Sequence, residues 1–199
     1  MKKIVYLSGG IGGAKLAKGF YHSKDIDLTI IINTGDDEVI HGVSLSPDID
    51  SVLYALAGIE GEMGWGVAND TFTVSDEYKK FNPQNFSIGN KDLALNLYRN
   101  QLLSEGKSLS EITKLFVEHL NLQCNLIPMT DDNVSTKLKT DDGTLLDFQE
   151  YFVEKQAKPK LTEVVYSGAE KAKVSDKLIK NIEESEIVVI GPSNPILSI

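Results

Sequence analysis

Short β-prone runs alternate along this chain with segments whose apolar residues recur at helical spacing. The runs at residues 4–7 and 28–32 are almost continuously apolar, which is typical of parallel strands buried on both faces. Between them, residues 14–21 have the spacing of a helix. These segments predict a strand, a helix and a second strand that lies parallel to the first.

Three helices with recognisable ends are expected in the next part of the chain. Asp50 or Ser51 caps the first of them, and Gly58 ends it. The second covers about residues 91–105. The third, at residues 109–120, begins with the Ser-x-x-Glu pattern of a capping box.

The last signals complete an α/β pattern. Asp142 and Gly143 lie between two β-prone runs and predict a hairpin. Ser175 caps a final helix, and "EIVVIGPSNP" predicts a buried strand that leads into a rigid loop. We therefore predict a mainly parallel, doubly wound sheet in a single domain, 1–199. An inserted α+β region that contains the hairpin is expected at about residues 65–170.

Composition and charge narrow the class of protein. The chain has 199 residues, of which 41% are hydrophobic, and its formal net charge is -9. This acidic balance argues against nucleic acid or an anionic membrane surface as a partner. The first apolar run is too short for a signal peptide, and no run reaches the length of a membrane span. Cys124 is the only cysteine, so no disulfide can form within the chain, and we expect a cytoplasmic protein.

The predicted sheet indicates where a ligand would bind. Ligands of doubly wound sheets lie beyond the carboxyl ends of the parallel strands. Three segments follow the clearest strands in this way, at residues 8–15, 33–50 and 191–198. We expect these segments to converge on one site.

A turn rich in glycine follows the first strand and contains a lysine. These residues are Gly9, Gly10, Gly12, Gly13 and Lys15. Without Cβ atoms, the backbone N–H groups can approach a phosphate at a helix N-terminus, and the lysine adds a positive charge in the first turn. The spacing is not that of a P-loop, and Lys15 replaces the last glycine of the dinucleotide fingerprint. The alternative is that the glycines only allow a tight turn.

Residues 33–51 contain five carboxylates and no lysine or arginine. The five are Asp36, Asp37, Glu38, Asp48 and Asp50. Carboxylates near phosphates require a cation between them, which makes Asp36 and Asp50 candidate ligands of Mg²⁺. One of these aspartates is alternatively a general base for a hydroxyl nucleophile, or a hydrogen-bond partner of a ribose. A solvated acidic loop is the remaining interpretation, and we favour it for Asp37 and Glu38.

Four other residues are candidates for ligand binding. Trp65, in a stretch of small residues, suits a pocket for a flat ring, although aromatic residues belong more often to a core. Lys91 places a cation in the first turn of a helix, against the helix dipole, which points to an anionic or carbonyl-rich ligand. Ser193 and Asn194 are held between prolines at the end of a strand, which suits hydrogen bonds to a nucleotide or phosphate.

Eight segments together resemble a known family. They are "SGGIGGAKLAKG", "NTGDD", "SPDIDSVLYALAG", "WGVANDTF", "FSIGNKDLA", "PMTDDNVST", "FQEYFV" and "IGPSNPILSI". In this order, they resemble the 2-phospho-L-lactate transferase (CofD-like) family of coenzyme F-420 biosynthesis, over essentially the whole chain. The resemblance implies a modified Rossmann-like fold and an Mg²⁺-dependent transferase.

The resemblance also implies a reaction and residue roles. A phosphorylated three-carbon acid would move from a guanosine diphosphate adduct to the ribityl hydroxyl of the deazaflavin Fo, releasing GMP. The glycine turn, Lys15 and residues 191–195 would hold the donor phosphates. Asp50, the second aspartate of the family's S-P-D-x-D pattern, would contact Fo near its reacting hydroxyl, with Asp48 as the other candidate catalytic residue. Lys91 matches an arginine that touches Fo, and Trp65 is a further candidate for contact with its ring.

Two departures from the family pattern are visible. The family's G-D-R-D-L-A sequence is here "GNKDLA", which loses a carboxylate at Asn90. The same change replaces a planar guanidinium by the point charge of Lys91. Family members also usually continue well beyond the "GPSNP" loop, so this chain is short at its C-terminal side.

Other functions stay open at this point. A nucleotide- or sugar-binding regulator of the gluconeogenesis-factor type would share the glycine loop and an N-T-x-D-D stretch, which in those proteins continues with glycines and serines. A general NAD-binding protein is disfavoured by Lys15. The sequence does not decide between phospholactate and phosphoenolpyruvate as the acid that is carried. A homodimer is one candidate assembly.

Overall fold

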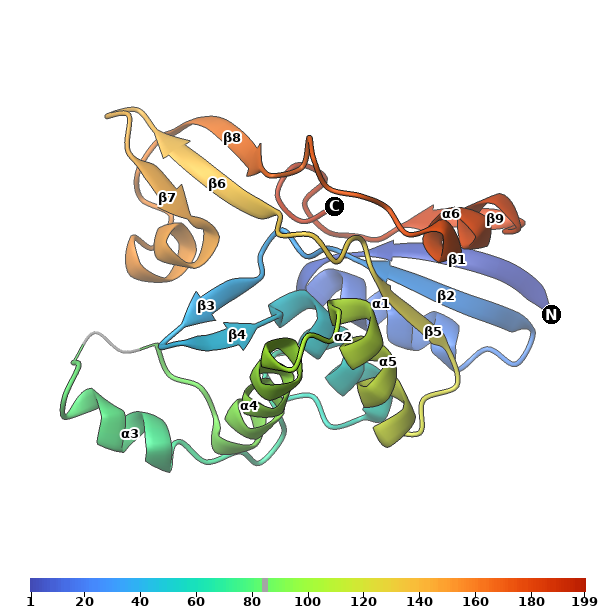
Figure 1. The fold of residues 1–199 in the computed structure, drawn as a ribbon, viewed down its shortest axis with the longest axis horizontal. Helices are drawn as coiled ribbons and strands as arrows, with labels where there is room; N and C mark the ends of the chain where they lie inside the picture. Colours follow the sequence, from blue (N-terminus) through green and yellow to red (C-terminus); the bar gives the residue numbers. More distant parts are fainter. Residues whose placement is uncertain (84–85) are drawn as a thin grey trace.

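A four-stranded parallel sheet forms the centre of the molecule (Figure 1). The structure, a computed structural model, describes residues 1–83 and 86–199. The strands of this sheet are β1 (Lys2–Ser8), β2 (Ile26–Ile32), β5 (Asn125–Pro128) and β9 (Ile187–Ile190). Their order is β5-β2-β1-β9, and each neighbouring pair is parallel. The predicted α/β fold with a mainly parallel sheet is confirmed.

Helices cover both faces of this sheet. The α-helices of the described chain are α1 (Gly10–Tyr21), α2 (Pro47–Ala57), α3 (Thr73–Lys79), α4 (Asn90–Ser104), α5 (Leu109–His119) and α6 (Asp176–Glu183). Successive residues of β1 face opposite sides, so Tyr6 packs in a core with Ala17 of α1, whereas Val5 packs with Leu178 of α6. The sheet is therefore doubly wound, as predicted. None of the helices in the described chain is both long and apolar enough to cross a membrane.

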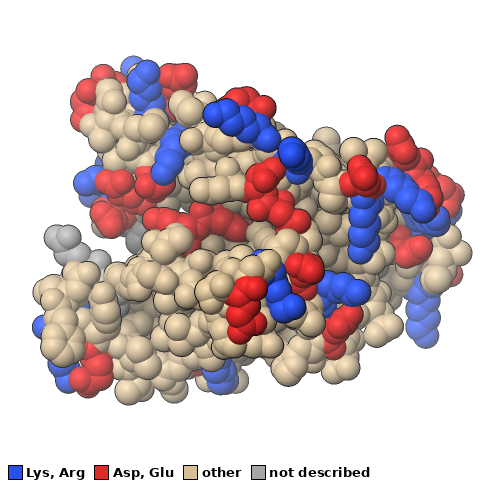
Figure 2. Space-filling model, in the orientation of Figure 1, with Lys and Arg blue, Asp and Glu red and all other residues tan. Residues whose placement is uncertain are grey.

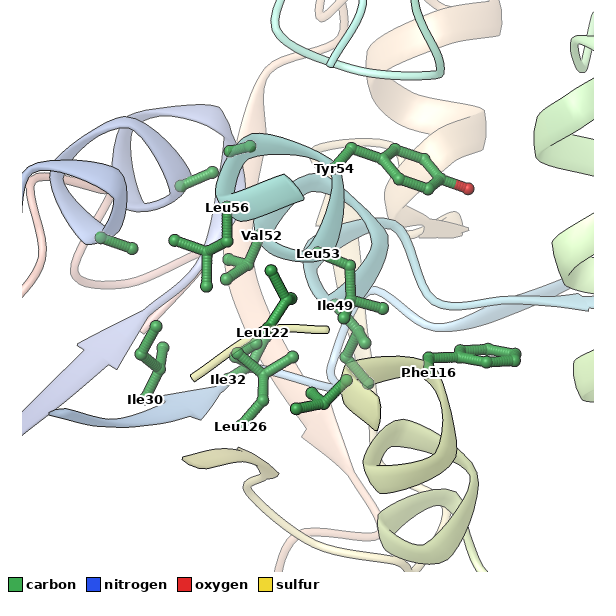
Figure 3. Close-up of a cluster of buried hydrophobic side chains, with 14 of the residues drawn as sticks. Ile30, Ile32, Ile49, Val52, Leu53, Tyr54, Leu56, Phe116, Leu122 and Leu126 are labelled. Carbon is green, nitrogen blue, oxygen red and sulfur yellow. The ribbon is translucent and has the colours of Figure 1, made fainter. Parts of the chain in front are cut away.

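The larger core lies between the sheet and α2 (Figure 3). Ile49, Val52 and Leu53 of α2 are completely buried, and they share this core with Ile30 and Ile32 of β2. Nearly every residue of α2 is buried. The first turn of α2 is therefore held rigidly by the packing of the rest of the helix.

Two helices begin earlier than the sequence predicts. Helix α1 begins at Gly10 rather than at about residue 14, so the glycines form its first turn instead of a loop before it. Helix α2 begins at Pro47, with Ser46 at the N-cap position, rather than at Asp50 or Ser51. Proline is favoured at the first helical position because its φ is already helical and its missing N–H needs no partner there.

The other predicted helix ends are confirmed. Gly58 ends α2 in the left-handed conformation, with φ 69°. At the start of α5, the Ser108 side chain accepts from the N–H of Glu111, and the Glu111 carboxylate accepts from the N–H of Ser108. Ser175 caps α6 through the N–H of Leu178.

Helix α4 takes its cap from a residue that is distant in sequence. Its N-cap is Gly89, and the Asp70 carboxylate accepts hydrogen bonds from the backbone N–H groups of Lys91 at 2.9 Å and Asp92 at 3.1 Å. A Cβ at position 89 would collide with the Asp70 carboxylate. The cap therefore requires both residues, and it fixes the first turn of α4.

A second, antiparallel sheet projects from the parallel one (Figure 1). Its strands are β6 (Ser135–Thr140), β7 (Leu145–Asp147) and β8 (Leu161–Ser167), and a π-helix, η1 (Glu150–Glu154), follows β7. The predicted hairpin is confirmed, since β6 and β7 pair on either side of Asp142 and Gly143. The region at about residues 65–170 also supplies β5, so it contributes to both sheets.

A small hairpin orders the acidic segment between β2 and α2. It consists of β3 (Glu38–Ile40) and β4 (Val43–Leu45), which pair antiparallel. His41 and Gly42 at its tip have positive φ values of 54° and 79°, as a two-residue hairpin turn requires. The carboxylates of this segment therefore lie on a defined backbone.

Strand β9 differs from the prediction of a buried strand. Ile187 is 43% exposed and Ile190 is 65% exposed. The reason is position, because β9 pairs only with β1, and no other strand of the described chain covers its outer edge. Its apolar sequence is that of an interior strand, although it lies at the edge of this sheet.

The cap of α4 leads to a first prediction. Asp70→Ala should lower the free energy of unfolding by about 1 kcal/mol, because two N–H groups at the start of α4 lose their acceptor. Asp76→Ala on α3 is the matched control, since the Asp76 side chain is exposed. Urea unfolding of the two variants measures the difference, and equal stability of both would contradict the cap.

Candidate functional site

The segments that follow β1, β2 and β9 converge on one cleft, beyond the carboxyl ends of the parallel strands. Gly10, Asp48 and Asn194 line it, one from each segment. The cleft has a volume of about 900 Å³. Figure 2 shows a hollow with acidic residues in its depth, between the part that carries β6 and β7 and the part that carries α3 and α4.

The lining of the cleft combines carboxylates with apolar side chains. The carboxylates are Asp36, Glu38, Asp48, Asp50 and Asp92. The apolar side chains are Ile11, Ile40, Leu45, Trp65, Phe86, Ile88, Phe148, Phe152 and Leu197. No lysine or arginine lines the cleft within residues 1–83 and 86–199. This lining suits a flat apolar ring and a cation.

The glycine turn packs closely against the loop that follows β9. A Cβ at Gly12 would collide with the carbonyl oxygen of Pro192, and one at Gly9 would collide with that of Ser198. Gly10 has φ 63°, and a Cβ there would lie 3.1 Å from the hydroxyl oxygen of Ser193. Glycine is therefore needed here for close packing between two segments, as well as for the turn itself.

Asp48 joins the first turns of α1 and α2. One carboxylate oxygen accepts from the N–H of Gly10 at 2.7 Å, and the other accepts from the side-chain amide of Asn33 at 3.0 Å. Burial raises the pKa of Asp48, and these two hydrogen bonds oppose the rise. One of the backbone N–H groups that the sequence assigns to a phosphate therefore already donates to Asp48.

Asp36 and Asp37 are buried carboxyl groups with incomplete hydrogen bonding. Burial and the nearby carboxylates of Asp48 and Asp37 raise the pKa of Asp36 to about 8, from an ordinary value of 3.8. Burial raises the pKa of Asp37 to about 8 as well. In the part of the chain that is described, Oδ1 of each has no hydrogen-bond partner. Such groups gain by binding a proton or a metal ion.

Asp50 is paired with the only arginine of the sequence. Both carboxylate oxygens of Asp50 accept from the guanidinium of Arg99, which reaches across from α4. The side chains of Asp50 and Arg99 are 8% and 1% exposed. Burial raises the pKa of Asp50 and Arg99 opposes the rise. We conclude that Asp50 stays ionised, because a two-pronged, desolvated ion pair favours the charged forms of both partners.

A hydrogen-bonded network extends from this pair. The guanidinium of Arg99 donates to the side-chain oxygen of Asn96, whose amide donates to Asp92 Oδ1 at 3.1 Å. The hydroxyl of Tyr54 on α2 donates to the same oxygen at 2.7 Å. Burial, with Asp50 nearby, raises the pKa of Asp92 to about 6. The network joins α2 to α4 at the cleft.

Only some of the other predicted site residues line the cleft. Trp65, Ser193 and Asn194 line the cleft. Lys15 is exposed in the second turn of α1, rather than in the first turn as expected, and does not line the cleft. The ammonium of Lys91 donates to the backbone carbonyls that precede Asp70, and Lys91 does not line the cleft either.

The described residues do not contain a ready-made metal cage. Within them, no group of three or more His, Cys, Asp or Glu side chains could hold a metal ion. Mg²⁺ is usually bound through one or two carboxylates, with waters and substrate phosphates as the other ligands. Asp36, whose Oδ1 is buried without a partner beside Asp48, fits that chemistry. Asp50 fits it less well, because Arg99 already engages both of its oxygens.

Sequence reasoning missed several residues of this site, namely Tyr54, Asp92, Asn96, Arg99 and Phe152. Arg99 and Asn96 lie one turn apart on α4, and neither belongs to a recognisable motif. Their signal was indirect, since a single arginine among 199 residues is unusual and its helical spacing from Asp92 places all three on one face. Phe152, from η1, has no sequence signal that separates it from a core aromatic.

Solved structures support the class of fold. The chain is similar to a member of the UPF0052 family from Bacillus halodurans, with a TM-score of 0.67 and 16% sequence identity. The match covers 100% of this chain and 61% of that one. The fold and the cleft at the strand ends define a Rossmann-like α/β protein.

The family is shown by the sequence itself. A family model described as 2-phospho-L-lactate transferase CofD matches residues 4–199. The chain therefore belongs to this family, and the resemblance carried by the eight segments is confirmed.

The named relatives divide into two groups. A phosphoenolpyruvate transferase from Streptomyces avermitilis is 39% identical over 204 residues, which cover 99% of this chain and 64% of the relative. A 2-phospho-L-lactate transferase from Methanococcus maripaludis is 37% identical over 206 residues, covering 99% and 66%. The chain thus spans about two thirds of the length of the curated relatives it matches.

The raised carboxyl pKa values predict how stability depends on pH. Asp36 and Asp37 have pKa values of about 8 in the folded chain, against an ordinary value of 3.8. Between pH 3.8 and pH 8, the folded chain therefore binds more protons than the unfolded chain. Stability should therefore fall as the pH rises toward 8, and Mg²⁺ should restore it at the higher pH. Thermal unfolding at both ends of this range checks the prediction. Asp36→Asn should weaken the pH dependence, whereas Asp27→Asn, at an exposed position, should not.

The buried ion pair predicts strong coupling between α2 and α4. Arg99→Met should lower the free energy of unfolding by about 3–5 kcal/mol, because it leaves Asp50 buried without its partner. The double variant Asp50→Leu, Arg99→Met should be considerably more stable than the single one. Urea unfolding measures both variants. The pairing would be contradicted if the double variant lost as much free energy of unfolding as Asp50→Leu and Arg99→Met lose together when each is made alone.

Proposed function

We infer that this chain carries the active site of a transferase. It would move a phosphorylated three-carbon acid from a guanosine diphosphate adduct to the ribityl hydroxyl of the deazaflavin Fo, in coenzyme F-420 biosynthesis. The observation that carries this proposal is the single cleft that joins the N-terminus of α1, a group of carboxylates and an aromatic lining. Membership of the CofD family supports the same reaction.

The donor phosphates would bind beside the first turn of α1. The helix dipole and the turn's backbone N–H groups favour an anion there. Ser193 and Asn194 face the same space from the loop after β9 and offer polar side chains. The cleft lining supplies no lysine or arginine from the described chain, so the charge of the phosphates has to be balanced in another way.

Mg²⁺ is the cation that we propose for this balance. Asp36, whose Oδ1 has no partner among the described residues, would hold it, and the nearby carboxylate of Asp48 would add negative charge beside it. When bound, the ion would neutralise charge on the phosphate oxygens and polarise the phosphoryl group that is transferred. The protein's own contribution is to keep these carboxylates buried, with Asp48 held in the first turn of α2 by Gly10 and Asn33.

The deazaflavin ring would bind against the aromatic lining. Trp65 comes from the segment after α2, whereas Phe148 and Phe152 come from the region around η1. The Phe148 and Phe152 rings lie 4.6 Å apart between centroids. A flat fused ring gains dispersion and stacking energy from such surfaces and needs few polar contacts to be held.

The reaction itself is a phosphoryl transfer in which one bond replaces another. The acceptor hydroxyl oxygen bonds to the phosphorus that carries the three-carbon acid. The bond from that phosphorus to the GMP oxygen breaks, GMP keeps the electron pair, and the hydroxyl proton is released. Positioning and charge balance supply most of the catalysis in reactions of this kind.

One group of relatives is named for phosphoenolpyruvate and the other for 2-phospho-L-lactate. Both acids are small, phosphorylated three-carbon compounds. We therefore propose this substrate class rather than one member of it.

Binding of Fo tests the proposed function. The wild-type chain should change the fluorescence of Fo on binding, and GDP with Mg²⁺ should tighten the complex. Phe152→Ala should weaken Fo binding about tenfold, because one stacking surface is lost, and should leave GDP binding unchanged. Phe81→Ala is the control, since Phe81 is 87% exposed and outside the cleft lining.

Two outcomes would contradict this proposal. A wild-type chain that binds GDP but not Fo would favour the regulatory, nucleotide-binding alternative. If the Phe81 and Phe152 variants both bound Fo as strongly as the wild type does, the ring would have to bind elsewhere.

A further inference from the structure

We propose that Asp92 is the catalytic residue that receives the proton of the acceptor hydroxyl. This assignment rests on the proposed transferase function and adds to it a residue that the sequence did not single out. Asp92 lies in the first turn of α4 and lines the cleft together with Asp50.

The hydrogen bonds of Asp92 leave one of its oxygens available. Oδ1 accepts from Tyr54 at 2.7 Å and from Asn96 at 3.1 Å. Oδ2 accepts no hydrogen bond from any residue that the structure describes. A carboxylate held firmly through one oxygen, with the other one free, has the arrangement needed to meet a hydroxyl of a bound ligand.

Asp50 does not have this arrangement. Both of its oxygens accept from Arg99, and its side chain is only 8% exposed. A carboxylate that lies against a buried guanidinium is a poor proton acceptor, because protonation would leave the guanidinium without its counter-charge. Asp50 therefore contributes a fixed negative charge, whereas Asp92 has an oxygen available for the acceptor.

Three neighbours hold Asp92 in place. Tyr54 is anchored on the buried helix α2, and Asn96 lies one turn further along α4. The backbone N–H of Asp92 donates to Asp70, so the main chain is fixed as well. The carboxylate thus has little freedom to turn away from the cleft, which a residue that must meet a hydroxyl at hydrogen-bond distance requires.

The proposed step balances without a further reactant. The acceptor O–H donates to Asp92 Oδ2, and its oxygen forms the new bond to phosphorus as the bond to the GMP oxygen breaks. The electron pair of the broken bond stays on GMP. Asp92 holds the proton and then releases it to solvent.

The test replaces the free oxygen and little else. Asp92→Asn keeps an Oδ1 that accepts from Tyr54 and Asn96 but removes the proton acceptor, so the fold should persist. We expect kcat to fall about 100-fold or more, with the donor KM and the Fo dissociation constant within about threefold of wild type. The temperature of unfolding, measured on the same samples, shows that the variant is folded.

Two further variants separate catalysis from structure. Tyr54→Phe removes one hydrogen bond to Oδ1 and should lower kcat by about tenfold, because Asp92 is then less firmly positioned. Asp176→Asn is the matched control, since Asp176 also lies in the first turn of a helix but outside the cleft lining. It should keep the wild-type kcat.

The outcomes distinguish this assignment from the function on which it rests. An active wild type with an Asp92→Asn variant of unchanged kcat would overturn the role of Asp92 alone. A variant with raised KM or weaker Fo binding but unchanged kcat would do the same, because Asp92 would then serve binding only. A wild-type chain that shows no transfer would overturn the proposed function and this assignment together.

Discussion

The ion pair between Asp50 and Arg99 is the constraint on which the cleft depends. It places two opposite charges in a region where both side chains are almost completely removed from water. Such a pair is retained only when its geometry is good and its remaining hydrogen-bonding groups are satisfied. Here Asn96 takes a further guanidinium N–H, and the ring of Phe116 lies 5.5 Å from the guanidinium carbon. The first turn of α2 is thereby held against the middle of α4, and the acidic part of the cleft lies beside this contact.

The charges left in the cleft explain which ligands it can accept. Arg99 pairs with one carboxylate only. The two lysines expected in the site, Lys15 at the donor phosphates and Lys91 at Fo, do not line the cleft. Burial and the nearby carboxylates of Asp48 and Asp37 raise the pKa of Asp36, and hydrogen bonds from Asn33 and Thr136 offset this rise only in part. A polyphosphate would be repelled by this lining unless a divalent cation accompanied it. The acidic cleft and the proposed anionic donor would thus be compatible through one ion.

The sequence predicts what depends on local order and misses what depends on tertiary pairing. The continuous apolar run of β2 and the capping box of α5 are local signals, and both were correct. The pairing of Asp50 with Arg99 spans 49 residues, and no local pattern records it. For the same reason β9 has the composition of an interior strand although its outer edge is uncovered, because composition reports hydrophobicity and not position in a sheet.

The glycine turn unites two interpretations that the sequence left as alternatives. Gly9 and Gly12 are needed because carbonyl groups of the loop after β9 occupy the space that a side chain would take, which is a packing requirement. Gly10 instead adopts a positive φ and lines the cleft, where its N–H is held by Asp48. The same packing brings Ser193 to the mouth of the turn. Close packing of the glycines therefore shapes this side of the cleft, and the tight turn and the proposed phosphate site are the same segment.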